Sequence, residues 1–225
     1  NKTYTGRIMG SYSSGLTKSG WAYSFLLSRR FATEGFKEGT PYDANSFFAT
    51  IEKKINDFHS LNLTAFYTPV KRGKASANTQ EVYDLKGIRY NSYWGKQDGK
   101  IRNSRMREVE EPTFILSHFW KVSEKLEINS NVGFQTGHIA NSRLGYDKAP
   151  NPDPAYYQKL PSYFLAETGG PNYEGAYRAY SSFVQDGQID WEGIYETNIL
   201  YGGTSRYYLY DDRNDDDLWM GSILV

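Results

Sequence analysis

The amino-acid sequence predicts an all-β fold, an antiparallel up-and-down sheet that forms a segment of a transmembrane β-barrel with long, partly helical extracellular loops. Three observations support this fold class. Apolar and polar residues alternate with a period of two in several stretches of about ten residues. Aromatic residues, which favour strands and membrane-interface girdles, make up 16% of the chain. Connections between these stretches alternate between short and long.

The clearest strand is expected at residues 21–31, where Trp21, Tyr23, Phe25 and Leu27 alternate with mostly small or polar residues. Similar alternation predicts strands at 60–69 and 125–136. Weaker patterns predict four more strands, at residues 4–13, 44–54, 109–121 and 218–225. We therefore expect seven strands.

Tight turns are expected at 15–20, 55–59 and 121–125, and long loops rich in Gly, Pro and Asn at 32–43, 70–108 and 137–217. In an up-and-down antiparallel sheet every second connection lies at the same end, so the short turns share one end and the long loops the other. Outer-membrane barrels have this layout, with short periplasmic turns and longer extracellular loops. About eleven tilted residues span roughly 25 Å, the height of the apolar band of such a barrel.

The strand pattern also predicts which side chains face lipid. Trp21, Tyr23, Phe25 and Leu27 should do so. Polar side chains have no partners in hydrocarbon. We therefore expect six of them to face a wet lumen or a plug: Asn62, Thr64, Glu127, Asn129, Asn131 and Gln135.

The last loop should contain short helices. Asp153 and Pro154 form an N-cap and N1 pair before residues 155–160, and Asp190 can cap a turn that begins at Trp191. A third helix is expected at 175–185. These helices predict a folded extracellular cap.

The two largest loops carry opposite charge. Residues 70–107 hold ten Lys and Arg against three Asp and Glu, about +7, and residues 137–217 hold six against thirteen, about −7. One hypothesis is that this asymmetry draws the two loops together over the barrel mouth, through many weak contacts and the buried aromatic residues between them. The alternatives are that each loop is separately solvated, or that the basic loop faces anionic lipopolysaccharide.

Composition excludes several classes of function. The formal net charge of +0 argues against a nucleic-acid binder, and the absence of Cys excludes thiolate metal sites and thiol nucleophiles. No apolar run is long enough for a helical membrane span. Because no nucleophile, phosphate-binding or metalloprotease motif occurs, we expect no enzymatic activity and assign no catalytic residues.

The acidic run near the end of the chain has the spacing with which a calcium loop begins, at Asp212, Asn214 and Asp216. An EF-hand would need Gly at 217 and Glu at 223, and the chain has Asp217 and Ile223. A looser structural calcium site is one hypothesis, and a solvated charged loop is the other. No further cofactor is expected.

Aromatic residues in the long loops are the candidate ligand-binding residues, because aromatic faces stack on sugar, siderophore or peptide groups. The alternative is that they form the core of the folded loops. The candidates are Tyr83, Tyr90, Tyr93, Trp94, Tyr156, Tyr157, Tyr163, Tyr173, Tyr177, Tyr180 and Trp191.

Local patterns along nearly the whole chain resemble barrel segments of TonB-dependent receptors of the Bacteroidetes type. The resemblance lies in GWAYSFLLSRRF at 20–31, SLNLTAF at 60–66, YNSYWG at 90–95, NPDPAYY at 151–157 and DRNDD at 212–216. It implies a large outer-membrane barrel, about 22-stranded, that is closed by an N-terminal plug and energised by TonB. It also allows a surface lipoprotein as partner. Since the plug and further strands are absent here, we expect the chain to be an internal part of a longer receptor.

The leading functional hypothesis is therefore import of a nutrient ligand, such as a siderophore, oligosaccharide or peptide, across the outer membrane. One alternative is a secreted carbohydrate-binding or hydrolytic β-sandwich, whose strands also alternate. Another is a passive porin or a barrel adhesin without a plug.

Overall fold

The computed structural model describes residues 3–166, 168–203 and 206–225. Strands account for 50% of the chain and helices for 17%, which confirms a mostly antiparallel β fold. The predicted loop 137–217 includes residues 167 and 204–205, which lie outside the described residues.

One large sheet forms the body of the molecule, and each strand is antiparallel to its neighbours. It contains β1 (Gly6–Ser13), β2 (Trp21–Ala32), β3 (Tyr42–Lys54), β4 (His59–Tyr67), β5 (Val70–Gly73), β8 (Met106–Glu110), β9 (Thr113–Ser123), β10 (Leu126–Tyr146) and β11 (Tyr207–Leu224).

Two of the long strands are interrupted at a proline. Pro69 separates β4 from β5, and Pro112 separates β8 from β9. Proline has no backbone N–H to donate, but its carbonyl still accepts, from Asn45 N at 3.0 Å and from Thr136 N at 3.2 Å respectively. β5 continues the line of β4, and β8 continues the line of β9, while β5 and β8 pair with each other. Counted in this way, the sheet has seven long strands. Each of them overlaps a strand that the sequence predicts.

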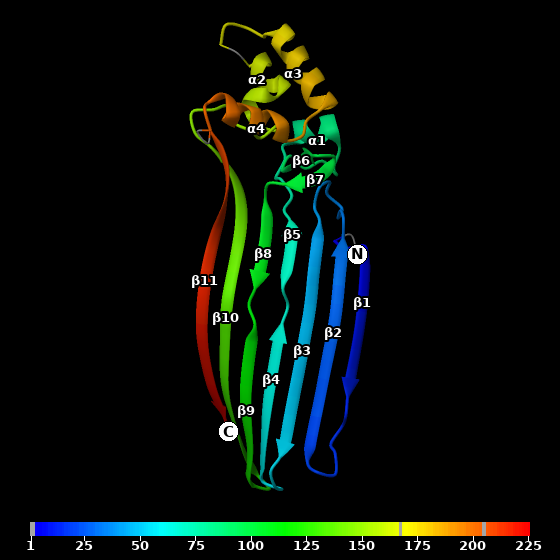
Figure 1. Ribbon diagram of the computed structural model, residues 1–225, viewed down its shortest axis with the longest axis vertical. Helices are drawn as coiled ribbons and strands as arrows, with labels where there is room; N and C mark the ends of the chain where they lie inside the picture. Colours follow the sequence, from blue (N-terminus) through cyan, green and yellow to red (C-terminus); the bar gives the residue numbers. More distant parts are fainter. Residues whose placement is uncertain (1–2, 167, 204–205) are drawn as a thin grey trace.

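The large sheet is open in the described part of the chain. β1 and β11 lie at its two edges and do not pair with each other there (Figure 1). β1, β2, β3, β4, β9, β10 and β11 are nevertheless neighbours in that order. Consecutive long strands therefore lie side by side.

The predicted boundaries of the last loop were wrong. β10 continues to Tyr146 and β11 begins at Tyr207, so the acidic run lies in a strand. β10 and β11 pair without interruption from Asn129–Leu224 to Tyr146–Tyr207, which gives their backbone N–H and C=O groups hydrogen-bond partners. The Arg143 side chain also forms an ion pair with Asp212 at 3.3 Å. Strand pairing therefore outweighs the usual preference of Asp and Asn for loops. The prediction of a loop at 70–108 was also wrong at its two ends, because β5 and the first part of β8 lie within this range and pair with each other in the sheet.

All helices of the described residues lie at one end of the sheet, and the short turns lie at the other (Figure 1). This helical end, the cap, contains α1 (Gln80–Lys86), the hairpin of β6 (Trp94–Gln97) and β7 (Lys100–Asn103), the 3₁₀ helix η1 (Tyr157–Lys159), α2 (Pro161–Leu165), α3 (Tyr173–Gln185) and α4 (Trp191–Leu200).

The helix predictions for the last loop were largely correct. Asp190 caps α4 by accepting from Gly193 N, and α3 contains the whole of 175–185. The expected helix at 155–160 is instead η1 followed by α2, because Asp153 caps only a single turn by accepting from Ala155 N at 2.9 Å.

Cross-strand register divides the sheet into two faces, because directly paired residues point to the same side. The apolar face carries two nearly continuous apolar rows: Tyr12, Phe25, Ala49, Ala65, Phe114, Phe134, Trp219; and Tyr23, Ile51, Leu63, Leu116, Val132.

The opposite side, the polar face, carries rows such as Ser13, Ser24, Thr50, Thr64, and Glu52, Asn62, Ser117, Asn131, Ser222. Apolar side chains interrupt it in places: Leu26, Phe48 and Phe66 form one row, Ile115 and Met220 continue the row of Thr64, and Phe119 lies between Ser60 and Asn129. The residues expected to face lipid lie on the apolar face. The six expected to face a lumen lie on the polar face.

Candidate functional site

The cap holds together through two small hydrophobic clusters. In the first, Tyr90 packs with Val82, Leu160 and Phe183, with the rings of Tyr90 and Phe183 edge to face at 5.4 Å. The Tyr90 hydroxyl donates to Gly187 O at 2.7 Å, and burial raises the pKa of Tyr90. This cluster joins residues 79–92 to the segment between β10 and β11.

The second cluster contains Ile189, Trp191 and Ile194. The Trp191 indole N–H donates to Arg102 O at 3.2 Å, and the Arg102 guanidinium lies 4.1 Å from the centre of the Trp191 ring. Ile189 N donates to Trp94 O at 3.0 Å. The β6–β7 hairpin and α4 are thereby fixed against each other.

The two large loops therefore meet as predicted, with buried aromatic residues between them, but not through ion pairs among the described residues. Among the described residues no Lys or Arg of 70–107 forms an ion pair with an Asp or Glu of 137–217. The polar contacts between the loops use neutral partners instead: Lys86 Nζ donates to Val184 O at 2.9 Å, and Ser162 Oγ donates to Glu81 at 2.6 Å. Much of the acidic charge lies along β11, away from the basic loop.

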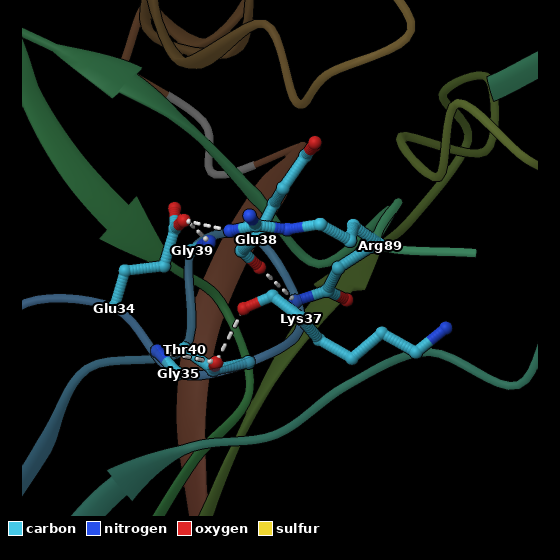
Figure 2. A network of polar contacts seen from close by, with 8 residues as sticks. Glu34, Gly35, Lys37, Glu38, Gly39, Thr40 and Arg89 are labelled. Atoms are coloured by element: carbon cyan, nitrogen blue, oxygen red, sulfur yellow. Dashed lines mark hydrogen bonds and ion pairs between the residues drawn. The ribbon is translucent and has the colours of Figure 1, made fainter. Parts of the chain in front are cut away.

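A third loop, between β2 and β3, is bound to the cap (Figure 2). Arg89 pairs with Glu34 at 2.9 Å, and the other carboxylate oxygen of Glu34 accepts from Gly39 N at 3.1 Å. Glu38 N donates to Arg89 O at 2.9 Å. This network holds residues 34–40 over the end of the sheet.

A small pocket, the cap pocket, lies where the cap meets the end of β10. Its volume is about 150 Å³, and it is lined by Ser92, Tyr93, Ser104, Arg105, Leu144, Tyr146, Asn151, Pro152, Asp153 and Ile189. The Arg105 guanidinium lies 5.1 Å from the centre of the Tyr93 ring. Ser92 Oγ is buried and has no hydrogen-bond partner in the described part of the protein.

The cap pocket combines a cation, a carboxylate, an amide and an aromatic ring with an unsatisfied buried hydroxyl. Buried hydroxyls are normally satisfied, so Ser92 Oγ marks a position where a ligand atom or water can bind. Sites for whole ligands usually measure about 300–1,000 Å³. The cap pocket is therefore smaller than a typical site for a whole ligand and has room for about one polar group.

The predicted aromatic site residues divide into several groups. Tyr90 and Trp191 are buried and form the cap core, so for them the structural alternative holds. Tyr93 lines the cap pocket. Tyr83 lies under Lys37, with 4.6 Å from the ammonium to the ring centre, and Trp94 is half-buried beside Gly39.

The remaining predicted aromatics lie on the outer part of the cap. Tyr156, Tyr157 and Tyr163 form a chain of ring contacts with centroid distances of 4.8 and 5.8 Å. Tyr173, Tyr177 and Tyr180 are exposed on α3. The structure thus does not bring all the predicted residues into one site.

Sequence reasoning missed most of the pocket. Ser92, Arg105, Tyr146, Asn151 and Asp153 come from three separate segments, and no local motif joins them. Tyr93 and Arg105 are twelve positions apart, so no local sequence pattern shows that they are neighbours before the β6–β7 hairpin folds. The register of that hairpin pairs Trp94 with Asn103, which brings Tyr93 and Arg105 together.

The proposed calcium residues Asp212, Asn214 and Asp216 lie on one side of β11, not in a loop as predicted. Asp212 pairs with Arg143, and the Asn214 amide donates to Asp216. In the described ranges, no group of three His, Asp or Glu side chains is arranged around a metal position. A calcium site here stays a prediction.

Comparison with protein-family models, with curated proteins and with solved structures finds no match to this chain. None of the helices in the described part of the chain combines the length and apolar character that crossing a membrane requires.

Proposed function

We propose that this chain forms part of the wall and the extracellular cap of an outer-membrane barrel receptor, which imports a nutrient ligand with energy from TonB. Capture takes place at the cap, and passage follows the polar face past a plug. A surface lipoprotein is a candidate partner. The proposed location is the outer membrane, with lipid against the apolar face, and the proposal assigns no enzymatic step.

The apolar face carries this proposal. Phe25, Leu63 and Leu116 are 46%, 46% and 50% exposed, although they lie in the middle of the sheet. In the described residues no other element packs over these rows. Monomeric soluble proteins rarely expose apolar patches beyond a few hundred Å². A hydrocarbon environment would satisfy such a surface, which supports the proposed location.

Charged residues on the apolar face lie toward its two ends. Arg29 pairs with Asp43 at 2.7 Å toward the cap, and Lys53 lies 4.8 Å from the centre of the Trp21 ring toward the turns. Trp21 and Arg29 are eight residue steps apart in β2, which is roughly 26 Å along the strand and about 19–22 Å in height at a strand tilt of 35–45°. This height is somewhat less than the apolar band of about 25 Å that outer-membrane barrels carry between their aromatic girdles.

The lengths of the connections differ between the two ends of the sheet, as the proposal requires. Short turns join β1 to β2, β3 to β4 and β9 to β10, whereas the cap gathers the long connections (Figure 1). The β-sandwich alternative requires a second sheet packed face to face on the first. In the described part of the chain the second sheet is the two-stranded β6–β7 hairpin, which belongs to the cap.

Cysteine labelling in intact outer membranes tests the proposal. We expect Cys at Leu63 or Val132 to be protected from a membrane-impermeant maleimide and to react with a lipid-soluble one. Cys at the matched polar-face positions Asn62 and Asn131 should react with the aqueous reagent. Recovery of the native protein in a soluble fraction without detergent, with Leu63 and Val132 covered by protein, would overturn it.

A further inference from the structure

Five cations gather on one side of the sheet next to the cap, and we call them the basic cluster: Arg72, Lys74, Arg105, Arg107 and Arg143. Arg72 pairs directly with Arg107 across β5 and β8, and Arg107 pairs with Asn141 of β10. Paired residues share a face, and Arg72 is also paired with Tyr42 of β3 on the polar face. The cluster therefore lies on the polar face.

Direct pairing of two like charges destabilises a sheet, because side chains of paired residues start only about 4.5–5.5 Å apart. Arg72 and Arg107 have this arrangement. In the described part of the structure neither guanidinium forms an ion pair, and Arg105 contacts the Tyr93 ring instead of a carboxylate. Arg143 is paired, with Asp212 at 3.3 Å. The remaining charge is about +4.

On the apolar face, two cations at the same distance from the cap have carboxylate partners. Lys71, one residue before Arg72, pairs with Glu108 at 2.9 Å, and Arg29 pairs with Asp43 at 2.7 Å. These two cations of the apolar face are thus each matched by a carboxylate. At this end of the sheet the uncompensated arginines, Arg72 and Arg107, lie on the polar face.

The surroundings of Lys74 show the same excess of positive charge. Lys74 Nζ donates to the neutral Asn141 amide oxygen at 3.2 Å. Burial and then the four neighbouring arginines lower the pKa of Lys74, and no carboxylate offsets them. A cavity of about 340 Å³ opens beside Arg72 and Lys74 and is lined also by Lys37, Thr40 and Tyr42. Solvent and a ligand can therefore reach the cluster.

We propose that the basic cluster binds a multiply charged oxyanion group, a phosphate or a polycarboxylate, carried by a soluble ligand. Arginine forks bind such groups bidentately, and the bound anion removes the repulsion between Arg72 and Arg107. That this ligand is the imported nutrient rests on the proposed function; the anion site itself does not. Arg105 also lines the cap pocket, so the two sites adjoin.

The test is calorimetric titration of the purified protein in neutral detergent with citrate and with inorganic phosphate, at low ionic strength. We expect saturable binding that weakens with salt. Arg72→Gln and Arg107→Gln should each weaken binding by about tenfold. Lys71→Gln, the matched loss of one cation on the same strand, should stay within about twofold.

Thermal unfolding gives a second measurement for the same variants. Without anion, Arg107→Gln should melt at or above the temperature of the unmodified protein, since it removes repulsion. Citrate should then raise the melting temperature of the unmodified protein more than that of the variant. Equal weakening by Lys71→Gln, no saturable binding of either anion, or binding of phosphatidylglycerol micelles in preference to citrate would each overturn the proposal. If the protein proves soluble without detergent, the same titrations in buffer still decide the anion site.

Discussion

Replacing Tyr90 by Phe isolates one hydrogen bond of the cap core. Tyr90 is 1% exposed, and its hydroxyl donates to Gly187 O, which is itself buried. Phe preserves the edge-to-face contact with Phe183 but leaves that carbonyl without its donor. Leaving a buried acceptor unsatisfied costs about 1–3 kcal/mol. We expect this loss in the free energy of cap opening.

Hydrogen exchange of backbone amides in α1 and α3 measures that free energy. Tyr177→Phe is the matched control, because Tyr177 is 70% exposed on α3, and its effect should stay within about 0.5 kcal/mol. Equal exchange rates in the Tyr90 and Tyr177 variants would refute the structural role of the hydrogen bond.

The pH dependence of the same variant gives an independent measurement. Burial raises the pKa of Tyr90, so the folded cap keeps its proton where the unfolded chain releases one. The stabilisation is fully present below the ordinary tyrosine pKa of about 10 and declines above it, by up to about 1.4 kcal/mol per pH unit. Tyr90→Phe should lack this decline, and the difference between the two proteins removes the contribution of other groups.

Three further predictions concern the apolar face and the cap. Phe25→Arg should destabilise the protein in lipid by about 2–4 kcal/mol if Phe25 lies near the bilayer midplane, whereas Ser24→Arg on the polar face should cost little; denaturant titration in vesicles compares them, and equal costs would reverse the assigned faces. Gly95→Ala should separate the β6–β7 hairpin from α4, because its Cβ would lie 1.9 Å from Ile189 O; faster proteolysis of residues 147–206 is the expected result, and an unchanged pattern would contradict it. Trp191→Ala should destabilise the cap by about 3–5 kcal/mol, since Trp191 is 2% exposed, while Tyr195→Ala, at 44% exposure, should cost less; hydrogen exchange in α4 measures both, and equal effects would show that burial is not the cause.

Local sequence patterns predicted much of the architecture. Period-two alternation in residues 21–31 and 60–69 determines which side chains share a face, because that property depends only on the extended backbone. Helix capping is also local, so Asp190 was found from the sequence. The ends of β10 and β11 were missed because the acidic residues 211–217 disfavour a strand locally and become one only through pairing with β10.

Tertiary structure alone decided the candidate sites. Arg72 and Arg107 are far apart in the chain, and only the hydrogen-bond register of β5 with β8 sets them opposite each other. The cap pocket likewise needs Tyr93, Arg105 and Asp153 to be brought together from separate segments. The sequence by itself determined the faces of the strands and the ends at which the loops gather, whereas side-chain chemistry between distant segments depended on pairing and packing energies that no local pattern encodes.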